Sequence, residues 1–280
     1  MILAPLRGVT TRCFRETFAE VIRGVGFTEA VTPFVSALPG RDPLRERELS
    51  GGPLPFRVTP QFIGKDPAAL RGCLEKVKEA GFDTADLNCG CPFPMVRSKG
   101  RGSGLLRTPR VLRIMLETGC GVMGAGRFSV KTRLGVDRAD ELLDLMPVLN
   151  DFPLRFLAVH PRTARQMYGG ECDIAMFERV AAAAKMPVVR NGDVPFEPGG
   201  GSCGNVMVGR SFIRYLGSRA DIGALLERYI SASLAEFGGE RPVLGRLKEL
   251  ISYWRDSPGW RRRWDAVKIC RSVVELRSVI

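Results

Sequence analysis

Residues 86–106 of the chain read DLNCGCPFPMVRSKGRGSGLL and join a predicted strand to a long polar loop. The apolar run at residues 84–87 favours a short buried strand, which stops at the segment 88–92. Pro92 cannot continue a strand ladder, and it restricts Cys91 to extended geometry. The sequence therefore predicts that the Cys91 thiol is presented on a loop at the end of a strand.

The loop that follows carries three alternating glycines, Gly100, Gly102 and Gly104, with Lys99 and Arg101 between them. Glycines let a backbone approach a ligand closely, and loops at strand ends often carry function. A cysteine, an amide and basic residues on one such loop indicate a reaction site. The alternative is that the cysteine is a small buried hydrophobe, which is the usual environment of a free cysteine.

Eight apolar segments of strand character recur along the chain and alternate with helical patterns. The expected strands lie at residues 2–5, 27–34, 58–63, 84–87, 128–134, 156–159, 187–189 and 205–208. The expected helices lie at residues 11–25, 66–80, 108–118, 140–149 and 175–184. Alternation of this kind favours parallel βαβ units, and eight units favour a closed barrel. We therefore predict a (β/α)8 TIM barrel over residues 1–217.

Two polar segments modify this pattern. Residues 40–55 are rich in Pro and Gly and are interpreted as a loop insertion. The connection at 193–209 is short, and its stretch PFEPGGGSCG (195–204) leaves little room for a helix. We expect one outer helix of the barrel to be reduced or lost there.

The last part of the chain changes character. Helical patterns at 222–237, 243–254 and 264–276 have no strands between them, which predicts an all-helical C-terminal domain at 218–280. Residues 241–280 hold ten Lys/Arg against four Asp/Glu, a net charge of +6 that is half of the chain's +12. Four aromatic residues are interleaved with the arginines: Tyr253, Trp254, Trp260 and Trp264. Such a region favours RNA contact, although the same aromatics can pack between helices.

Composition narrows the classes of protein to consider. The hydrophobic content of 45% supports a large core, and no apolar run approaches the length that spans a bilayer. The N-terminus lacks the order of a signal peptide, so we expect a cytoplasmic protein. The eight cysteines form no CxxC pair or Cys/His cluster, so we expect neither a metal site nor a disulfide framework. The charge of +12 favours a polyanionic partner, with plain solubility as the alternative.

Chemistry-bearing residues fall at the ends of successive predicted strands, where barrels keep their sites. These residues are Pro5, Gln61, Asn88, Cys91, Lys131, His160, Asn191, Gly209 and Arg210. So many at successive strand ends are hard to obtain from a purely structural sequence. The chain has one histidine, which is more often structural than functional, but its position at a strand end before Arg162 favours a function.

A flavin is the ligand that these residue types suggest. Loops after the seventh and eighth strands of barrels commonly bind phosphate, and residues 191–193 with Gly209-Arg210 lie there. Gln61 can pair with the edge of a heterocycle, and Lys131 can place a cation beside an electron-accepting ring. A ring with a phosphate tail suggests FMN. No GxGxxG follows a strand, so a Rossmann dinucleotide site is not predicted.

The same residues, in this order, resemble the tRNA-dihydrouridine synthases. The segments that carry the resemblance are LAPLRGVT (3–10), TPFV (32–35), QFIG (61–64), DLNCGCP (86–92), SVKTRLG (129–135), VHPRT (159–163), RNGD (190–193) and VMVGR (206–210). The tail GRLKELISYWRD (245–256) is similar to the helical domain of the bacterial C-type branch, which modifies uridine 16 in the tRNA D-loop. The resemblance implies an FMN-dependent oxidoreductase that reduces the C5=C6 bond of a uridine in tRNA, with NADPH or NADH as reductant.

The resemblance also implies roles for individual residues. Hydride would pass from N5 of reduced FMN to C6, and Cys91 would donate a proton to C5. A thiol suits this step because its usual pKa of about 8.5 leaves it protonated at neutral pH. The implied cofactor-binding residues are Ala4, Pro5, Leu6, Gln61, Lys131, His160, Asn191, Gly192, Asp193, Gly209 and Arg210. The implied substrate-binding residues are Asn88, Lys99, Arg101 and Arg162.

The chain departs from the family pattern at Met95, where lysine is common, and at Pro161 and Arg190. Two other functions remain open: an FMN barrel that reduces a free pyrimidine, and a tRNA-binding protein without catalysis. The target base would have to leave its stack to react. We expect a monomer, because tRNA would cover the basic face.

Overall fold

The computed structural model describes residues 1–199 and 205–280. Its strands are β1 (Ile2–Leu3), β2 (Glu29–Val31), β3 (Val35–Ser36), β4 (Arg57–Thr59), β5 (Gln61–Ile63), β6 (Ala85–Cys89), β7 (Phe128–Gly135), β8 (Leu157–Thr163), β9 (Val188–Arg190) and β10 (Met207–Val208). Every strand pair in the structure is parallel. The strands therefore form βαβ units, as the alternation in the sequence predicts.

The strands form two sheets, which are connected at two places to close the barrel. One sheet has the order β10-β1-β2-β4 and the other the order β3-β5-β6-β7-β8-β9. β4 and β5 are separated only by Pro60, which has no N–H for a ladder. An isolated bridge links Arg190 of β9 to Val206, the residue before β10. The predicted TIM barrel is confirmed, with the second and third barrel strands each split into two pieces.

Outer helices cover the barrel: α1 (Arg12–Thr17), α2 (Ala19–Gly24), α3 (Pro67–Glu79), α5 (Pro109–Met123), α6 (Glu141–Asn150) and α7 (Ile174–Ala183). The expectation of one helix over 11–25 was wrong, because the helix breaks at Phe18. The Phe18 ring is fully buried and lies 4.6 Å from the Phe14 ring and 5.9 Å from the Tyr229 ring. Packing against a distant part of the chain thus overrides local helix preference at this point.

Four short helical elements lie in segments that the sequence indicates as loops: η1 (Pro43–Arg45), η2 (Arg47–Leu49), α4 (Pro94–Arg97) and η3 (Gly102–Arg107). The 40–55 insertion is anchored by Glu48, whose carboxylate accepts from the buried Arg15 guanidinium at 3.1 Å. In the connection between β9 and β10, the described residues 191–199 and 205–206 contain no helix. Residues 200–204, part of the segment where a helix was expected to be reduced or lost, lie outside the described residues.

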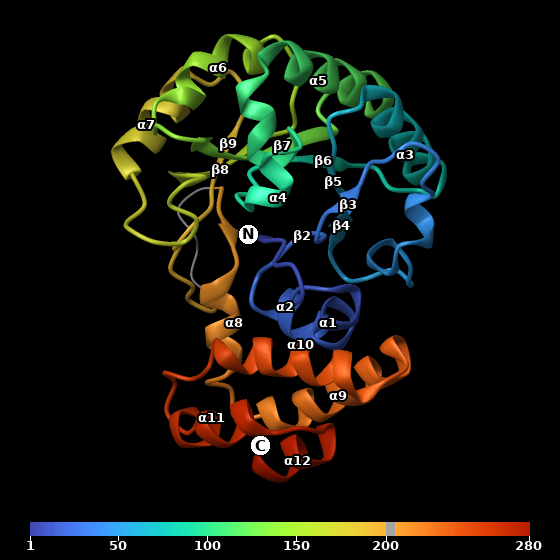
Figure 1. Ribbon diagram of the computed structural model, residues 1–280, viewed down its shortest axis with the longest axis vertical. Helices are drawn as coiled ribbons and strands as arrows, with labels where there is room; N and C mark the ends of the chain where they lie inside the picture. The colour runs from blue at the N-terminus through green and yellow to red at the C-terminus, as the bar shows by residue number, and fades with distance from the viewer. Residues whose placement is uncertain (200–204) are drawn as a thin grey trace.

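The C-terminal part consists of α8 (Arg210–Leu216), α9 (Ile222–Phe237), α10 (Glu240–Ser252), α11 (Trp260–Ile269) and α12 (Val273–Val279), grouped at one end of the molecule (Figure 1). The single helix expected over 264–276 was wrong, because α11 ends before Cys270. Lys248 donates to the carbonyl oxygens of Lys268 and Cys270 at 2.9 and 2.6 Å, and the Ser272 hydroxyl caps α12. These bonds satisfy helix-end groups and allow the chain to turn.

One hydrophobic cluster joins the C-terminal helices to the barrel. It includes Phe14 and Phe18 of the first helices and Tyr229 of α9, and Figure 1 shows α1 and α2 facing α10 and α9. Trp254 and Trp260 are buried, and their indole N–H groups donate to the carbonyls of Ile213 and Gly217 at 2.6 and 2.9 Å. For these two tryptophans the packing alternative holds. The division at 217/218 stays a prediction.

Among the described residues, no helix has the length and apolar character that crossing a membrane requires.

Candidate active site

A cavity of about 1140 Å³ opens at the C-terminal ends of the barrel strands and extends to α8 and α10. Its volume is in the range of pockets that hold cofactors and small ligands, or slightly above it. Most residues that the sequence singles out line it: Ala4, Pro5, Leu6, Gln61, Asn88, Cys91, Lys131, His160, Asn191, Gly192, Asp193, Gly209 and Arg210. The fold therefore brings strand ends from around the barrel to one place.

A chain of hydrogen bonds holds the loop that carries Cys91. The buried Asp86 carboxylate accepts from Gln61 Nε2 at 2.8 Å and from Ser129 Oγ at 2.6 Å. Gln61 Oε1 accepts from Asn88 Nδ2 at 2.9 Å. Asn88 Oδ1 accepts from the backbone N–H of Gly90 at 3.1 Å and of Cys91 at 2.9 Å. Each amide in this chain is thus fixed in orientation by its neighbour, starting from the carboxylate.

The Cys91 side chain is buried, 6% exposed, and lies at the wall of the cavity. Burial raises the pKa of its thiol, against smaller opposing effects of a Phe93 backbone hydrogen bond and of the charges on Arg7, Arg133 and Lys131. The thiol is therefore protonated at neutral pH. This is the state that a proton donor needs.

The glycines after Cys91 pack against protein. Gly102 has φ +58°, and a Cβ there would lie 2.8 Å from Cys91 Cβ. A Cβ on Gly104 would overlap the carbonyl oxygen of Arg97. Ser103 donates to the Cys91 carbonyl through its N–H at 3.1 Å and its hydroxyl at 2.9 Å. In this structure the glycines let the loop fold tightly behind the thiol.

Three predicted substrate-binding residues do not line the cavity. Lys99 is exposed, and Arg101 is partly buried with its Nε unpaired, both on the same loop as the thiol. Arg162 is buried behind His160, with Nη1 3.0 Å from His160 Nε2 and a further ion pair to Asp193. Their substrate roles stay predictions.

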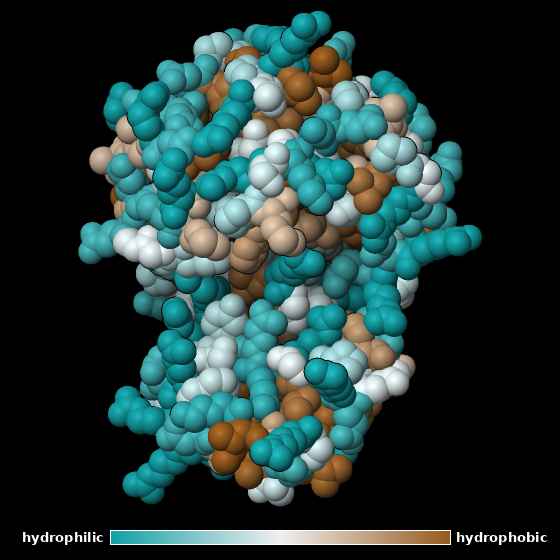
Figure 2. All heavy atoms as spheres, viewed as in Figure 1, coloured by the Kyte–Doolittle hydropathy of each residue, from teal (hydrophilic) through white to brown (hydrophobic). Residues whose placement is uncertain are grey.

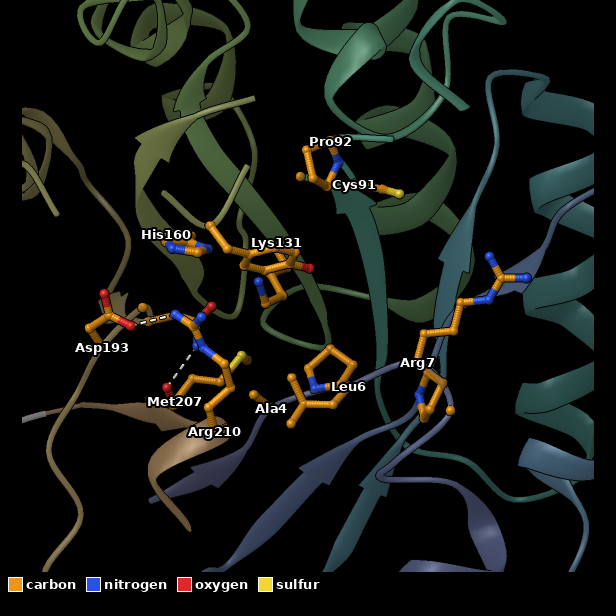
Figure 3. Close-up of a pocket in the computed structure, with 18 of the residues that line it drawn as sticks. Ala4, Leu6, Arg7, Cys91, Pro92, Lys131, His160, Asp193, Met207 and Arg210 are labelled. Carbon is orange, nitrogen blue, oxygen red and sulfur yellow. Dashed lines mark hydrogen bonds and ion pairs between the residues drawn. The ribbon is translucent and has the colours of Figure 1, made fainter. Parts of the chain in front are cut away.

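The opposite wall of the cavity is cationic (Figure 3). Four cations surround His160: Lys131, Arg133, Arg162 and Arg210. Burial, followed by these charges, lowers the pKa of His160 to about 2, so the imidazole is neutral. Burial, with the charge of Arg133, lowers the pKa of Lys131 to about 8. Asp193 pairs with both Arg162 and Arg210, which leaves an excess of positive charge.

Several lining residues were not selected from the sequence, among them Arg7, Arg133 and Tyr168. Arg133 and Arg7 lie in the segments SVKTRLG and LAPLRGVT, and their positions beside strand ends are the signal in the sequence that marks them. Arg133 donates to the carbonyls of Gly90 and Thr163 at 3.0 and 2.9 Å and so ties two strand-end loops together. Tyr168 is 50% exposed, and its ring centre lies 5.5 Å from the guanidinium carbon of Arg133 and 5.3 Å from that of Arg210. It lies on a loop beyond β8, where no pattern marks it.

These residues fit a bound flavin nucleotide. The excess of cations around a neutral histidine suits a phosphate. Gly192 has φ +86°, and a side chain there would overlap the His160 ring, while a Cβ on Gly209 would lie 3.2 Å from Ala4 Cβ. The absence of a side chain at both positions therefore lets segments that line the cavity pack closely together. Among the described residues, no group of three or more His, Cys, Asp or Glu side chains is arranged to hold a metal ion.

A parallel β/α barrel with its cavity at the carboxyl ends of the strands defines a large class of proteins, and comparison narrows that class. The profile of the family described as "Dihydrouridine synthase (Dus)" matches residues 2–198. The chain belongs to the dihydrouridine synthase family.

Individual relatives agree with this assignment. The chain is 32% identical over 195 residues to "tRNA-dihydrouridine synthase B" of Vibrio cholerae, an alignment that covers 69% of this chain and 60% of that protein. It is 26% identical over 288 residues to "Probable tRNA-dihydrouridine synthase 1" of Synechocystis, covering 92% and 79% of the two chains. The matched part thus spans about 60% of the Vibrio relative's length.

Solved structures support the fold. An old yellow enzyme homologue from Zymomonas mobilis superposes with a TM-score of 0.56 at 14% identity, covering 76% of this chain and 85% of that one. Morphinone reductase in complex with tetrahydroNAD superposes with a TM-score of 0.52 at 12% identity, covering 76% and 83%. At these identities the likeness concerns the barrel alone.

Proposed function

We propose that the protein is a flavin-dependent tRNA-dihydrouridine synthase that reduces the C5=C6 bond of a uridine to 5,6-dihydrouridine. The observation that carries the proposal is the arrangement of one cavity with a protonated thiol, Cys91, on one wall and a cationic wall around His160 opposite. Membership of the dihydrouridine synthase family and the names of the relatives support the reaction. The basic C-terminal helices support tRNA as the partner.

FMN is the cofactor we propose, and, reduced by NADPH or NADH, it supplies the hydride for uracil C6. Arg210 and the backbone of Asn191, Gly192 and Gly209 would hold its phosphate. Gln61, Lys131 and His160 would contact the ring, with the neutral imidazole as a hydrogen-bonding group and the ammonium as a cation.

Cys91 donates the proton to uracil C5. Its raised pKa keeps the thiol protonated until it reacts, and the charges of Arg7, Arg133 and Lys131 stabilise the thiolate that forms. The hydrogen bonds that Asn88 Oδ1 accepts from the N–H groups of Gly90 and Cys91 fix the loop, so the thiol is positioned before substrate arrives.

Asn88 orients the base. Its Oδ1 is occupied by two backbone N–H groups and one Nδ2 hydrogen is donated to Gln61, so a second N–H remains for the cavity. An N–H donor that faces position 4 of the base would complement the O4 carbonyl of uracil and oppose the 4-amino group of cytosine. The preference for uridine would thus follow from the amide chain that begins at Asp86.

The modified nucleotide that we propose is uridine 16 of the D-loop, on the resemblance of residues 245–256 to the C-type branch. The base must leave its stack to reach the cavity. We further propose that the protein acts as a monomer in the cytoplasm, where its substrate is found.

A single turnover tests the function. The flavin of the purified protein is reduced without oxygen, unmodified tRNA is added, flavin oxidation is followed, and dihydrouridine is mapped in the product. Oxidation with one dihydrouridine at position 16 is expected. Modification at another position overturns the position alone. Flavin that oxidises with free uridine as fast as with tRNA favours the free-pyrimidine reductase, and a protein that binds tRNA but takes up no flavin overturns catalysis.

A further inference from the structure

We propose that Phe34, Phe93, Met95 and Arg7 form a subsite for the nucleotide that adjoins the target uridine, holding its base by stacking and its phosphate by charge. The proposal rests on the proposed function and names how the same cavity binds the RNA beyond the reacting base. We call these four residues the flanking subsite.

The apolar part of this subsite is exposed beside the thiol. Phe93 is 43% exposed and Met95 is 80% exposed, and both line the cavity together with Cys91. They lie directly after Cys91-Pro92, at the start of the short helix α4. Apolar spheres gather on the surface where α4 lies, next to hydrophilic ones (Figure 2). Exposed apolar side chains beside a reaction site indicate a surface that a ligand covers when it binds.

Arg7 supplies the charge. It lines the same cavity, and its guanidinium carbon lies 5.5 Å from the centre of the Phe34 ring. Figure 3 shows the side chain extending toward the side of the cavity that carries Cys91. No ion pair involves Arg7 within residues 1–199 and 205–280; the acidic lining residues Glu249 and Asp256 belong to α10 and the loop after it. Arg7 is therefore a cation available to an anionic group.

Base extrusion from the RNA identifies the anionic group that Arg7 would bind. A base that leaves a stack exposes the face of the neighbouring base, and a phosphate links the two nucleotides. Single-stranded nucleic acid is commonly held by aromatic side chains that stack on bases and by arginines that bind the backbone. The flanking subsite offers both within the cavity that takes the extruded uridine. An unstacked nucleotide has both a base face and a phosphate, and the net charge of +12 favours such an anionic ligand.

A coupling experiment tests the stacking. Wild type and Phe93→Ala are compared on an unmodified tRNA transcript and on two transcripts that lack the base immediately before or after the modified uridine. Phe93→Ala is expected to lower kcat/KM roughly tenfold on the complete transcript. On one of the two abasic transcripts the substitution is expected to have no further effect. Ile114→Ala, which removes an exposed apolar side chain from α5 (40% exposed), is the matched control and is expected to change nothing.

The charge is tested through salt dependence. Arg7→Ala is expected to reduce the slope of log Kd against log salt by about one, as for the loss of one phosphate contact. Arg110→Ala on the exposed face of α5 is the control, with an unchanged slope expected.

Equal losses from Phe93→Ala on the complete and both abasic transcripts overturn the subsite, as does no loss on any. The same combinations are also measured as tRNA affinities, so the coupling is judged even where no dihydrouridine forms. Wild-type turnover on the complete transcript reports on the proposed function separately, because it does not depend on the coupling.

Discussion

The side chains on the two walls of the cavity differ in their burial and in the contacts that hold them in place. On the cationic wall His160 is buried, Lys131 and Arg210 are partly buried, and Asp193 forms ion pairs with Arg210 and with Arg162 behind the histidine. The thiol wall carries exposed Phe93 and Met95 next to Cys91. The difference indicates that one wall is shaped for a ligand that stays bound and the other for a ligand that arrives and leaves at each turnover.

Removing the thiol should affect one wall alone. Cys91→Ala is expected to slow dihydrouridine formation about 10²–10⁴-fold, because the general acid is lost, while FMN affinity stays the same. Single-turnover kinetics and flavin titration measure the two effects. Cys120→Ala on α5, outside the cavity, is the control. A wild-type rate for Cys91→Ala would disprove the assignment of the proton donor.

Removing a cation from the other wall should weaken cofactor binding. Lys131→Met is expected to weaken FMN binding about 10–100-fold, the worth of a charged hydrogen bond, with little effect on tRNA affinity. Fluorescence titration of FMN measures the first, and Lys185→Met, an exposed lysine outside the cavity, is the control. Equal losses of FMN and tRNA affinity would contradict the division between the walls.

The tight loop behind the thiol can be tested through stability. Gly102→Ala is expected to cost about 1–3 kcal/mol, because φ is +58° and the new Cβ would lie 2.8 Å from Cys91 Cβ. Gly72→Ala in α3 has open space and is expected to be neutral or to stabilise by about 0.5–1 kcal/mol. Denaturant unfolding measures both. Equal stability of the two variants would show that the loop is not constrained.

The smallest expected effect is a pH dependence confined to the cationic wall. The pKa of Lys131 is lowered to about 8, so its charge is present at pH 7 and mostly lost at pH 9. A bound anionic flavin favours the charged form, so FMN affinity is expected to fall up to about tenfold between pH 7 and 9. The fall should vanish in Lys131→Met. A variant that keeps the full pH dependence would assign the titration to another group.

The strand ends could be predicted because they need only two patterns: alternating apolar segments and the residue that ends each one. This placed Gln61, Asn88, Lys131 and His160 at the cavity. The direction of a side chain within a loop could not be predicted from the sequence. Lys99 lies on the same loop as Cys91 but does not line the cavity. The path of this loop depends on the close contacts of Gly102 with Cys91 and of Gly104 with Arg97, which are made only in the folded chain.

Helix breaks were missed for a similar reason. Phe18 and Cys270 lie within sequences of good helical periodicity. Their breaks depend on the Tyr229 ring and on Lys248, which come from other parts of the chain. Tyr168 was missed because its partners, Arg133 and Arg210, are brought to it by strand β7 and helix α8.

The buried contact of Phe14 and Phe18 with Tyr229 has a mechanical consequence. It fastens the basic helices to the barrel through a common core, so the distance from the helices to the thiol is a fixed length. If the helices bind RNA as proposed, the nucleotide that reacts would be the one that lies this fixed distance from the RNA segment bound by the helices. We therefore expect the RNA to do the bending, and a longer or shorter junction at Gly217 to shift the modified position along the loop.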